Sequence, residues 1–266
     1  MLIFLPHNSR YTRFPTLIFL VAHLSVPACL PASFIRCEAI STAIKEIESN
    51  KKVQGMVLTS SNPSTLSAGL DLNELYNPDP ARLTKFWTSF QQLFLDLYGS
   101  RLAVIGAIGG NAPAAGCMLA LCCDYRIMAS TPSKGRPPVI GLNEAKFGIA
   151  APPWLGALML RTIGFRQGEL ALSLGTLYTP EQALAIGMVD AIVPGDEVMA
   201  KSREAALTWT KIPPHARVAS KMLARKEYLD DLIVKRDEDV EHFSRFILNE
   251  KVQVNLGAYL ESLKRK

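Results

Sequence analysis

The chain has 266 residues, of which 48% are hydrophobic and 20% charged, so it can bury a sizeable core and is too apolar to be disordered. Its net charge of +5 comes from scattered lysines and arginines, and the basic clusters KKVQ (51–54) and LKRK (263–266) are short. This pattern argues against nucleic-acid binding and suits an anionic small ligand.

Cysteine and histidine usage argues against disulfides and metal chemistry. The chain contains five cysteines, an odd number, and three of them lie in the apolar run AAGCMLALCCDY. Buried free thiols in a reducing compartment explain this pattern better than disulfides do. No cysteine pair has zinc-ligand spacing with a histidine nearby, and the four histidines lie far from the glycine-rich centre. We therefore expect no metal site and no Ser/His catalytic pair.

The first 36 residues form an atypical N-terminal segment. They contain no acidic residue and carry Arg10 and Arg13 between apolar blocks that four prolines interrupt. These blocks are too short to span a bilayer, so we expect no stable membrane insertion. A targeting sequence, a signal peptide, an incorrect start and a membrane-associated stretch at 16–30 are all compatible with this composition.

The next hundred residues alternate between helical and strand patterns. Residues 37–50 have apolar positions at helical spacing, and 53–60 (VQGMVLTS) is typical of a buried strand. A loop of turn-forming residues follows, in which Asp71 is placed to cap a short helix. Residues 80–98 repeat apolar and aromatic side chains at i, i+3, i+4 and i+7, which predicts a long helix with its aromatic side chains in the core.

The remaining chain continues the alternation and then becomes helical. Residues 102–110 and 124–130 predict two more buried strands, and Pro113 favours a helix that begins near Ala114. A short strand is expected within 187–194. We therefore expect an α/β core at 37–205 that carries the active site, followed by a helical region at 206–266 that serves as a cap or oligomerisation arm.

Two loops of small residues leave buried strands and lead into helices. They are LSAGLDL (66–72) and GGNAPAAG (109–116). Gly, Ala and Ser allow a ligand to approach the backbone, and backbone N–H groups at a helix start favour negative charge. The spacing does not match a dinucleotide or phosphate-binding motif. The two loops together predict an oxyanion hole, although small residues also permit tight strand–helix packing.

A single carboxylate, Glu144, interrupts the apolar stretch VIGLNEAKFGIAAPPW (139–154). An ionised carboxylate in apolar surroundings is unfavourable unless it is paired or its pKa is raised. Glu144 therefore either points to solvent from a surface helix or acts as a base in a dry pocket. In a pocket, an apolar wall formed by Leu142, Phe147 and Ile149 would raise its pKa toward roughly 6–7.

These segments together resemble the crotonase, or enoyl-CoA hydratase/isomerase, superfamily. The marks are LSAGLDL, GGNAPAAGCMLALCCDYRIMA and GLNEAKFGI, and the resemblance runs from about Cys37 to the C-terminus. Their order and spacing are most similar to the mitochondrial Δ3,Δ2-isomerases of this family. The resemblance implies an α/β, crotonase-type ββα spiral core with a helical C-terminal region, which commonly assembles as a homotrimer.

The resemblance also assigns roles to individual residues. The backbone N–H groups of Leu70 and Ala115 would form the oxyanion hole for an acyl-CoA thioester, and Glu144 would be the catalytic base. Hydratases carry an additional glutamate where this chain has Met118, which favours isomerisation over water addition. The implied substrate-binding residues are Ala68, Gly69, Asp71, Leu72 and Asn143.

The resemblance implies a 3-enoyl-CoA to trans-2-enoyl-CoA isomerase of fatty acid β-oxidation in the mitochondrial matrix. It implies no metal or redox cofactor, because CoA is part of the substrate. Three departures from the family pattern are evident: Ala115 replaces a usual Gly, the loop SKGRPPV (133–139) is long, and residues 1–36 are expected to lack the opening strands. An enoyl-CoA hydratase and a non-catalytic acyl-CoA-binding homologue are the alternatives.

Overall fold

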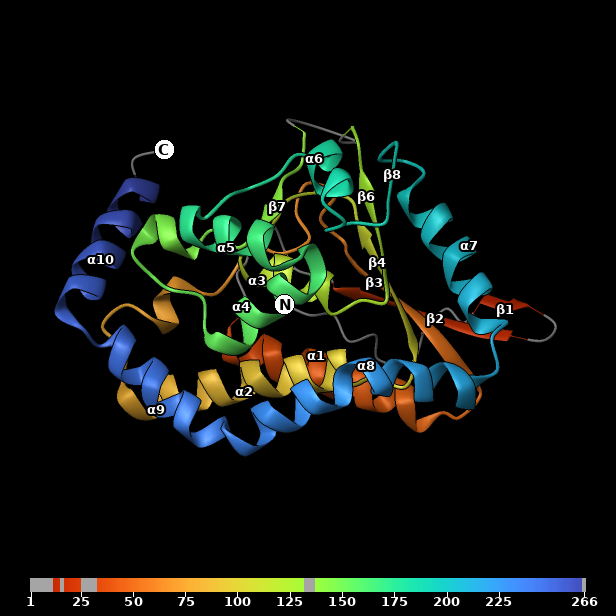
Figure 1. Ribbon diagram of the computed structural model, residues 1–266, viewed down its shortest axis with the longest axis horizontal. Helices are drawn as coiled ribbons and strands as arrows, with labels where there is room; N and C mark the ends of the chain where they lie inside the picture. Colours follow the sequence, from red (N-terminus) through yellow and green to blue (C-terminus); the bar gives the residue numbers. More distant parts are fainter. Residues whose placement is uncertain (1–11, 15–16, 25–32, 132–136, 265–266) are drawn as a thin grey trace.

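The computed structural model describes residues 12–14, 17–24, 33–131 and 137–264, and its architecture is α/β, as predicted (Figure 1). The central sheet has the strand order β1-β2-β3-β4-β6-β8; β1 and β2 are antiparallel, and the other neighbouring pairs are parallel. These strands are Thr12–Phe14, Leu17–Leu24, Val53–Ser60, Ala103–Ile108, Tyr125–Ala129 and Ala191–Val193. A separate parallel pair joins β5 (Ala112–Pro113) to β7 (Ile140–Gly141).

The expectation that residues 1–36 lack opening strands is wrong. Residues Leu17–Leu24 form β2, which pairs in parallel with β3, and Thr12–Phe14 form β1 at the sheet edge. The stretch LIFLVAHL has the length and apolar composition of a buried parallel strand, which hydropathy alone does not distinguish from a targeting segment. The remaining residues of the segment 16–30 lie outside the described residues.

The predicted elements from residue 34 onward are largely confirmed. The predicted strand at 53–60 and helix at 80–98 have the predicted bounds, and the predicted helix near Ala114 begins at Ala115. Glu144 begins a 3₁₀ helix, η2 (Glu144–Phe147), and Asp71 caps another, η1 (Leu72–Glu74). The α-helices α1 to α10 are Phe34–Ser49, Pro80–Tyr98, Ala115–Leu121, Pro153–Ile163, Phe165–Leu174, Pro180–Ala185, Val198–Thr210, Pro214–Val234, Arg236–Ile247 and Glu250–Lys264.

The sheet is covered on both faces. One face of β3, β4 and β6 packs against α7, with Val57, Ile105 and Ala129 in a small apolar cluster between them. The opposite face contributes to the main core, which contains α2 and reaches the C-terminal helices through Phe243 and Ile247. Burial on both faces explains why these strands are continuous apolar runs rather than alternating ones. The proposed division near residue 205 stays a prediction.

The carboxyl ends of β3 and β4 bring the two small-residue loops together. Thr65 forms a parallel bridge with Asn111, and Leu66 N donates to Asn111 O at 2.8 Å. The β5–β7 pair then places the second loop beside the Glu144 segment, where Ala114 N donates to Gly141 O at 2.8 Å. Three segments that are separate in the sequence therefore meet at one edge of the sheet.

The thiols and the loop ahead of Glu144 can be compared with the sequence predictions in part. Cys37, Cys117, Cys122 and Cys123 are buried free thiols, as predicted, and Cys29 lies outside the described residues. The loop SKGRPPV lies mostly outside the described residues as well. Within the described ranges, no helix combines the length and the apolarity needed to cross a membrane.

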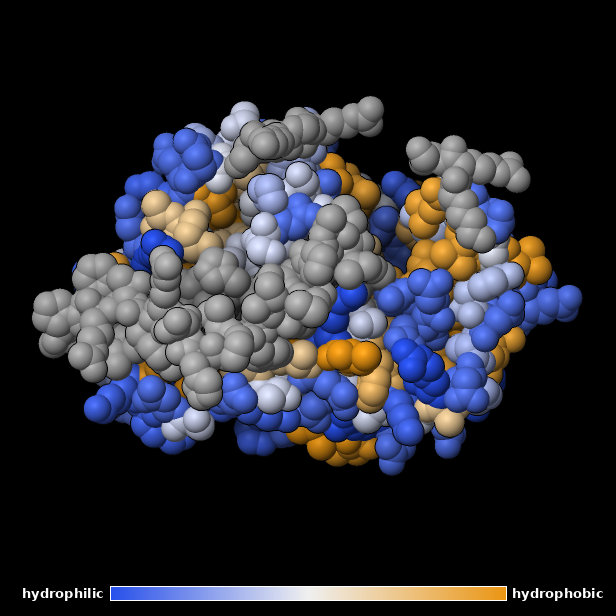
Figure 2. Space-filling view, turned by 180° about the vertical axis from the view of Figure 1, so that it is seen from behind, coloured by the Kyte–Doolittle hydropathy of each residue, from blue (hydrophilic) through white to orange (hydrophobic). Residues whose placement is uncertain are grey.

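Exposed apolar side chains occur at several places on the described surface. Phe165, Leu223 and Val234 are 72%, 90% and 83% exposed. Figure 2 shows the face opposite to that of Figure 1, on which the visible described residues form apolar areas separated by hydrophilic ones. This face does not present one continuous apolar surface among those residues, and the homotrimer stays a prediction.

Candidate active site

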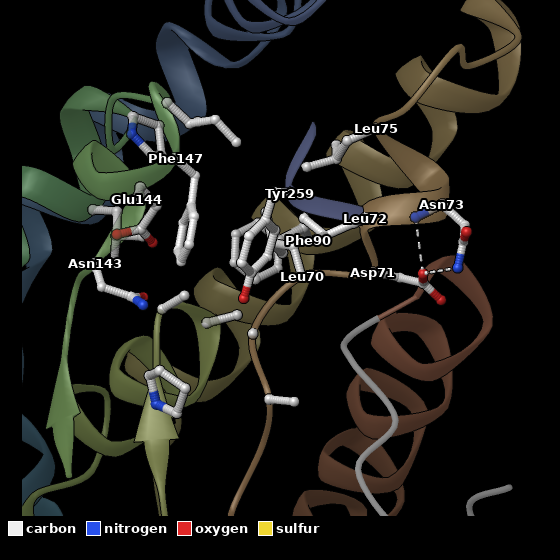
Figure 3. Close-up of a pocket in the computed structure, with 18 of the residues that line it drawn as sticks. Leu70, Asp71, Leu72, Asn73, Leu75, Phe90, Asn143, Glu144, Phe147 and Tyr259 are labelled. Carbon is white, nitrogen blue, oxygen red and sulfur yellow. Dashed lines mark hydrogen bonds between the residues drawn. The ribbon is translucent and has the colours of Figure 1, made fainter. Parts of the chain in front are cut away.

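Glu144 is the first residue of η2 and lies between β7 and a tight turn. Asn143 precedes it, and Gly148 ends the 3₁₀ helix at a φ of +70°. Ile149 N donates to Glu144 O at 3.2 Å, which closes this turn. The short helix fixes the backbone of Glu144, and its side chain extends toward the cavity drawn in Figure 3.

The carboxyl group of Glu144 is in an apolar environment. Its Oε2 atom is buried, and no described residue forms a hydrogen bond with it. Burial raises the pKa of this carboxyl from 4.5 to about 7, against a smaller opposing effect of its own backbone N–H. The predicted direction and range of this pKa are therefore confirmed. Phe147 and Ile149 line the cavity as expected, whereas Leu142 is buried in the core.

Glu144 opens into a cavity of about 360 Å³, a volume suited to a small-molecule ligand. Its walls come from the first loop, α2, the start of α3, η2, α4, α9 and α10. Most of the lining is apolar. The lining residues are Ala68–Leu72, Asn73, Leu75, Trp87, Phe90, Pro113, Ala114, Ala115, Asn143, Glu144, Phe147, Ile149, Ala150, Pro152, Leu155, Phe243, Tyr259, Leu260 and Leu263.

The two loops expected to supply backbone N–H groups are in direct contact. A Cβ atom added at Gly69 would lie 3.1 Å from Ala114 Cβ, and one added at Gly116 would lie 2.7 Å from Ser67 O. Leu70 and Ala115 therefore lie in two loops that contact each other, and both residues line the cavity.

The Ala115 N–H lies at a helix start. Ala115 is the first residue of α3, a position whose N–H has no acceptor within the helix. Leu70 is a β-bridge residue of the first loop, and it lines the same cavity. A backbone N–H donor at the wall of an apolar cavity can stabilise a developing oxyanion.

The turn that precedes the Ala115 N–H is strained at Ala114. Its backbone has a φ of +50° and a ψ of −120°, a conformation that residues other than Gly rarely adopt. Backbone strain of this kind costs roughly 1–3 kcal/mol and gathers at functional sites. The hydrogen bond from Ala114 N to Gly141 O holds the turn in place.

Asp71 lines the cavity but uses its carboxylate elsewhere. Its Oδ1 accepts hydrogen bonds from Asn73 N at 3.0 Å and Asn73 Nδ2 at 2.9 Å, which caps η1 as predicted. Figure 3 shows this side chain directed toward Asn73 and away from Glu144. Glu144 is therefore the lining carboxylate that is free to act on a ligand.

The family resemblance places the second acid of hydratases at the position of Met118. This side chain is fully buried in α3, where it accepts a hydrogen bond from the Cys122 thiol at 3.5 Å between the sulfur atoms. Glu144 and Asp71 are the two carboxylates among the lining residues. Elsewhere in the described ranges, no three His, Cys, Asp or Glu side chains are grouped so as to hold a metal ion.

Several cavity residues were not predicted from the sequence. Tyr259, Leu260 and Leu263 of α10 form one wall, and Phe147 packs on Tyr259 with ring centroids 4.2 Å apart. Trp87 and Phe90 were predicted as core residues, and they also line the cavity. The periodicity of α2 and α10 identifies their buried faces, but it does not reveal that these faces border a cavity.

Comparisons with known proteins agree with this arrangement. A family model described as enoyl-CoA hydratase/isomerase matches residues 36–266. The crystal structure of human mitochondrial delta3-delta2-enoyl-CoA isomerase aligns with a TM-score of 0.89 and 40% identity, covering 93% of this chain and 94% of that one. An enoyl-CoA hydratase from Bacillus halodurans, at 20% identity and a TM-score of 0.76, shares the fold. The predicted crotonase-type fold is therefore confirmed.

Curated relatives give the family. Enoyl-CoA delta isomerase 1, mitochondrial, is 44% identical in Mus musculus and 42% identical in Homo sapiens, over 224 residues in each case. These alignments cover 84% of this chain and 76% and 73% of the two relatives. The chain belongs to the enoyl-CoA hydratase/isomerase family.

Proposed function

We propose that this protein is an enoyl-CoA isomerase of fatty acid oxidation that converts 3-enoyl-CoA to trans-2-enoyl-CoA. The observation that carries this proposal is the unpartnered carboxyl of Glu144 in an apolar cavity that Leu70 and Ala115 also line. The names of the curated relatives support the same activity.

In the proposed mechanism, Glu144 transfers one proton between two carbons. The carboxylate removes a proton from C2, the electrons of the broken C–H bond form a dienolate, and the protonated Glu144 returns the proton to C4. The Leu70 and Ala115 N–H groups donate to the thioester oxygen as it gains negative charge. A pKa of about 7 makes Glu144 a stronger base than an exposed carboxylate while leaving it largely ionised just above neutrality.

The other candidate residues would bind the substrate. Gly69 permits the chain turn that presents the Leu70 N–H, at a φ of +103°. Ala68, Asp71 and Leu72 flank this turn and would contact the CoA moiety through the loop backbone. Asn143 lines the cavity beside Glu144, and its buried Oδ1 has no partner among the described residues, so we assign it a direct contact with the substrate.

The proposal distinguishes isomerisation from hydration through Met118. Water addition to a 2-enoyl thioester uses two acids, whereas double-bond migration needs only one group that reaches both C2 and C4. Met118 supplies no proton, and Asp71 is engaged with Asn73. The reaction consumes no oxidant and no reductant, so we propose that it uses no redox cofactor. We also propose that it uses no metal ion, because backbone N–H groups would stabilise the thioester oxygen.

The location is proposed from the relatives, and the assembly from the family resemblance. The curated relatives are named as mitochondrial, and we propose that this chain acts in the mitochondrial matrix. The resemblance to the crotonase family supports the proposal of a homotrimer. Its basic net charge of +5 is compatible with that compartment.

The test of this function is an absorbance measurement of the conjugated 2-enoyl thioester. Purified protein added to trans-3-hexenoyl-CoA should increase this absorbance, and the same protein added to trans-2-hexenoyl-CoA should not remove it by hydration. A folded protein that binds the first substrate without any increase would instead be a non-catalytic acyl-CoA-binding homologue. Rapid loss of the second absorbance would identify a hydratase.

The pH dependence of the reaction should report the Glu144 carboxyl. Because the base must be ionised, kcat/KM should rise with pH through about 7 and level off above about pH 8. Below about pH 6 it should fall roughly tenfold per pH unit. The measurement is kcat/KM for trans-3-hexenoyl-CoA from pH 5 to 9. A midpoint near the value of an exposed glutamate, about 4.3, would contradict the apolar environment assigned to this carboxyl.

A further inference from the structure

One carboxylate oxygen outside the reaction site accepts three hydrogen bonds. Asp239 Oδ2 accepts from Trp87 Nε1 and Gln91 Nε2 at 2.7 Å each, and from Trp154 Nε1 at 3.1 Å. The donors come from α2 and α4, whereas Asp239 belongs to α9. An indole N–H can only donate, so each buried tryptophan needs such an acceptor to hold one orientation.

Four buried side chains of the cavity lining lie at or beside these bonds. Trp87, Phe90 and Leu155 are at most 2% exposed, and Phe243 is 5% exposed. We call these four residues the cavity floor. In contrast, Ala68, Asn73, Ala150 and Leu263 line the same cavity at its exposed rim. The large polar end of an acyl-CoA must remain near the rim, so its acyl chain points toward the floor.

Asp239 and Phe243 both belong to α9, and both contact Trp87 of the floor. They are four residues apart on α9 and therefore share one face of it. Phe243 stacks on Trp87 with ring centroids 3.3 Å apart and an interplanar angle of 7°. Trp87 also contacts Trp154 at a centroid distance of 6.0 Å. The orientation of Trp87 is thus fixed by its hydrogen bond to Asp239 and by packing on both sides.

We propose that Asp239 is a positioning residue that sets the longest acyl chain the cavity accepts. It acts through its hydrogen bonds to Trp87, which belongs to the floor, and to Trp154, which packs on Trp87. The orientation of Trp87 determines how deep the floor lies. This inference rests on the proposed function, since it assigns a chain-length limit to the same substrate class. Removal of the carboxylate would leave both indole N–H groups without their acceptor, whereas Gln91 Nε2 keeps Arg236 O at 3.2 Å. The Trp87 ring would then be free to turn, which deepens the cavity.

Arg236 provides a control that distinguishes this role from simple attachment of α9 to α2. Arg236 also joins the two helices: its Nη1 donates to Gln92 Oε1 at 2.9 Å, its Nη2 to Thr88 O at 2.8 Å and its Nε to Gln91 Oε1 at 3.2 Å. None of these acceptor residues lines the cavity. An Arg236 variant therefore loosens the same helix pair, and Gln91 with it, while both indole N–H groups keep their hydrogen bonds to Asp239.

The experiment compares trans-3-hexenoyl-CoA with trans-3-dodecenoyl-CoA in wild type, Asp239→Ala, Asp239→Asn and Arg236→Ala. In Asp239→Ala, the ratio of kcat/KM for the long substrate to that for the short one should increase at least about tenfold, mainly through KM, because each accommodated methylene contributes about tenfold or more. Asp239→Asn retains an acceptor oxygen and should stay within about threefold of wild type, and Arg236→Ala should leave the ratio unchanged.

Two results would overturn the inference. One is an equal loss for both substrates in Asp239→Ala, which indicates only a structural role, and the other is an equal shift of the ratio in Arg236→Ala. If Asp239→Ala does not fold, Asp239→Leu is measured in its place under the same criteria. Binding of hexanoyl-CoA and dodecanoyl-CoA by calorimetry gives the same ratio without turnover, so a failure of the proposed isomerase function is seen separately in the wild type.

Discussion

Glu144→Gln should lower kcat for isomerisation of trans-3-hexenoyl-CoA by about ten-thousandfold. The amide cannot accept a proton from C2 and cannot return one to C4, so a single substitution disables both proton transfers. A positioned acid or base contributes about 10² to 10⁴ in rate to one transfer. KM should change little, because glutamine has nearly the shape of glutamate and fills the same space among Phe147 and Ile149.

The matched variant is Glu144→Asp. It keeps the carboxylate but withdraws it by one methylene, so partial activity with an unchanged pH midpoint is expected. A Glu144→Gln enzyme that retains more than about a tenth of wild-type kcat would show that another group removes the proton.

Glu144→Gln should also stabilise the folded protein at high pH. Because the folded state raises the pKa of this carboxyl from 4.5 to about 7, it favours the protonated form. The resulting contribution to the free energy of unfolding is present below about pH 4.5 and is lost as the pH rises through 7. At pH 8, Glu144→Gln should therefore increase that free energy by at most about 3 kcal/mol, and at pH 4.5 by little. Urea unfolding at the two pH values measures this difference.

Gly69→Ala should lower kcat/KM by about one hundred- to one thousandfold, the loss expected for one oxyanion donor. Gly69 has a φ of +103°, which an alanine rarely adopts, and the added Cβ would lie 3.1 Å from Ala114 Cβ. The loop must shift to accept the methyl group, and this shift displaces the Leu70 N–H from the position where it meets the thioester oxygen. The measurement is kcat/KM together with the affinity for a saturated acyl-CoA, which should change much less.

Gly187→Ala is the control for backbone strain. Gly187 has a φ of +74°, but nothing lies within 4 Å of an added Cβ, and the residue is not part of the cavity lining. This variant should lose about 1 kcal/mol of stability and keep wild-type activity. If both glycine variants lost activity equally, the effect of Gly69→Ala would reflect stability rather than the oxyanion donor.

Elements with strong local signals could be predicted from the sequence alone. The strand at 53–60 and the helix at 80–98 have the predicted bounds because one is a continuous apolar run and the other repeats apolar residues with clear helical spacing. β2 was missed because an eight-residue apolar run near the N-terminus looks the same in a sheet and in a targeting segment. Its pairing with β3 depends on residues about 35 positions away.

Glu144 and the two small-residue loops could be singled out from the sequence, whereas the shape of the cavity could not. Glu144 is recognisable because an isolated carboxylate in an apolar run requires an explanation, and the family resemblance singles out Leu70 and Ala115 within the two loops. The floor was not predicted, because Trp87 and Phe243 lie more than 150 residues apart and meet only in the folded chain. Asp239 was missed for the same reason, since in sequence it is one of several acids at the start of α9.

The most direct test of the account follows one hydrogen atom through the reaction. Trans-3-hexenoyl-CoA in which deuterium replaces both hydrogens of C2 is converted in ordinary water. The product is then analysed for deuterium at C4. In the proposed mechanism Glu144 lies in an apolar cavity and transfers the same proton from C2 to C4, so most of the product should carry deuterium at C4. Product that contains only protium at C4 would contradict a single-carboxylate shuttle and require a second proton donor.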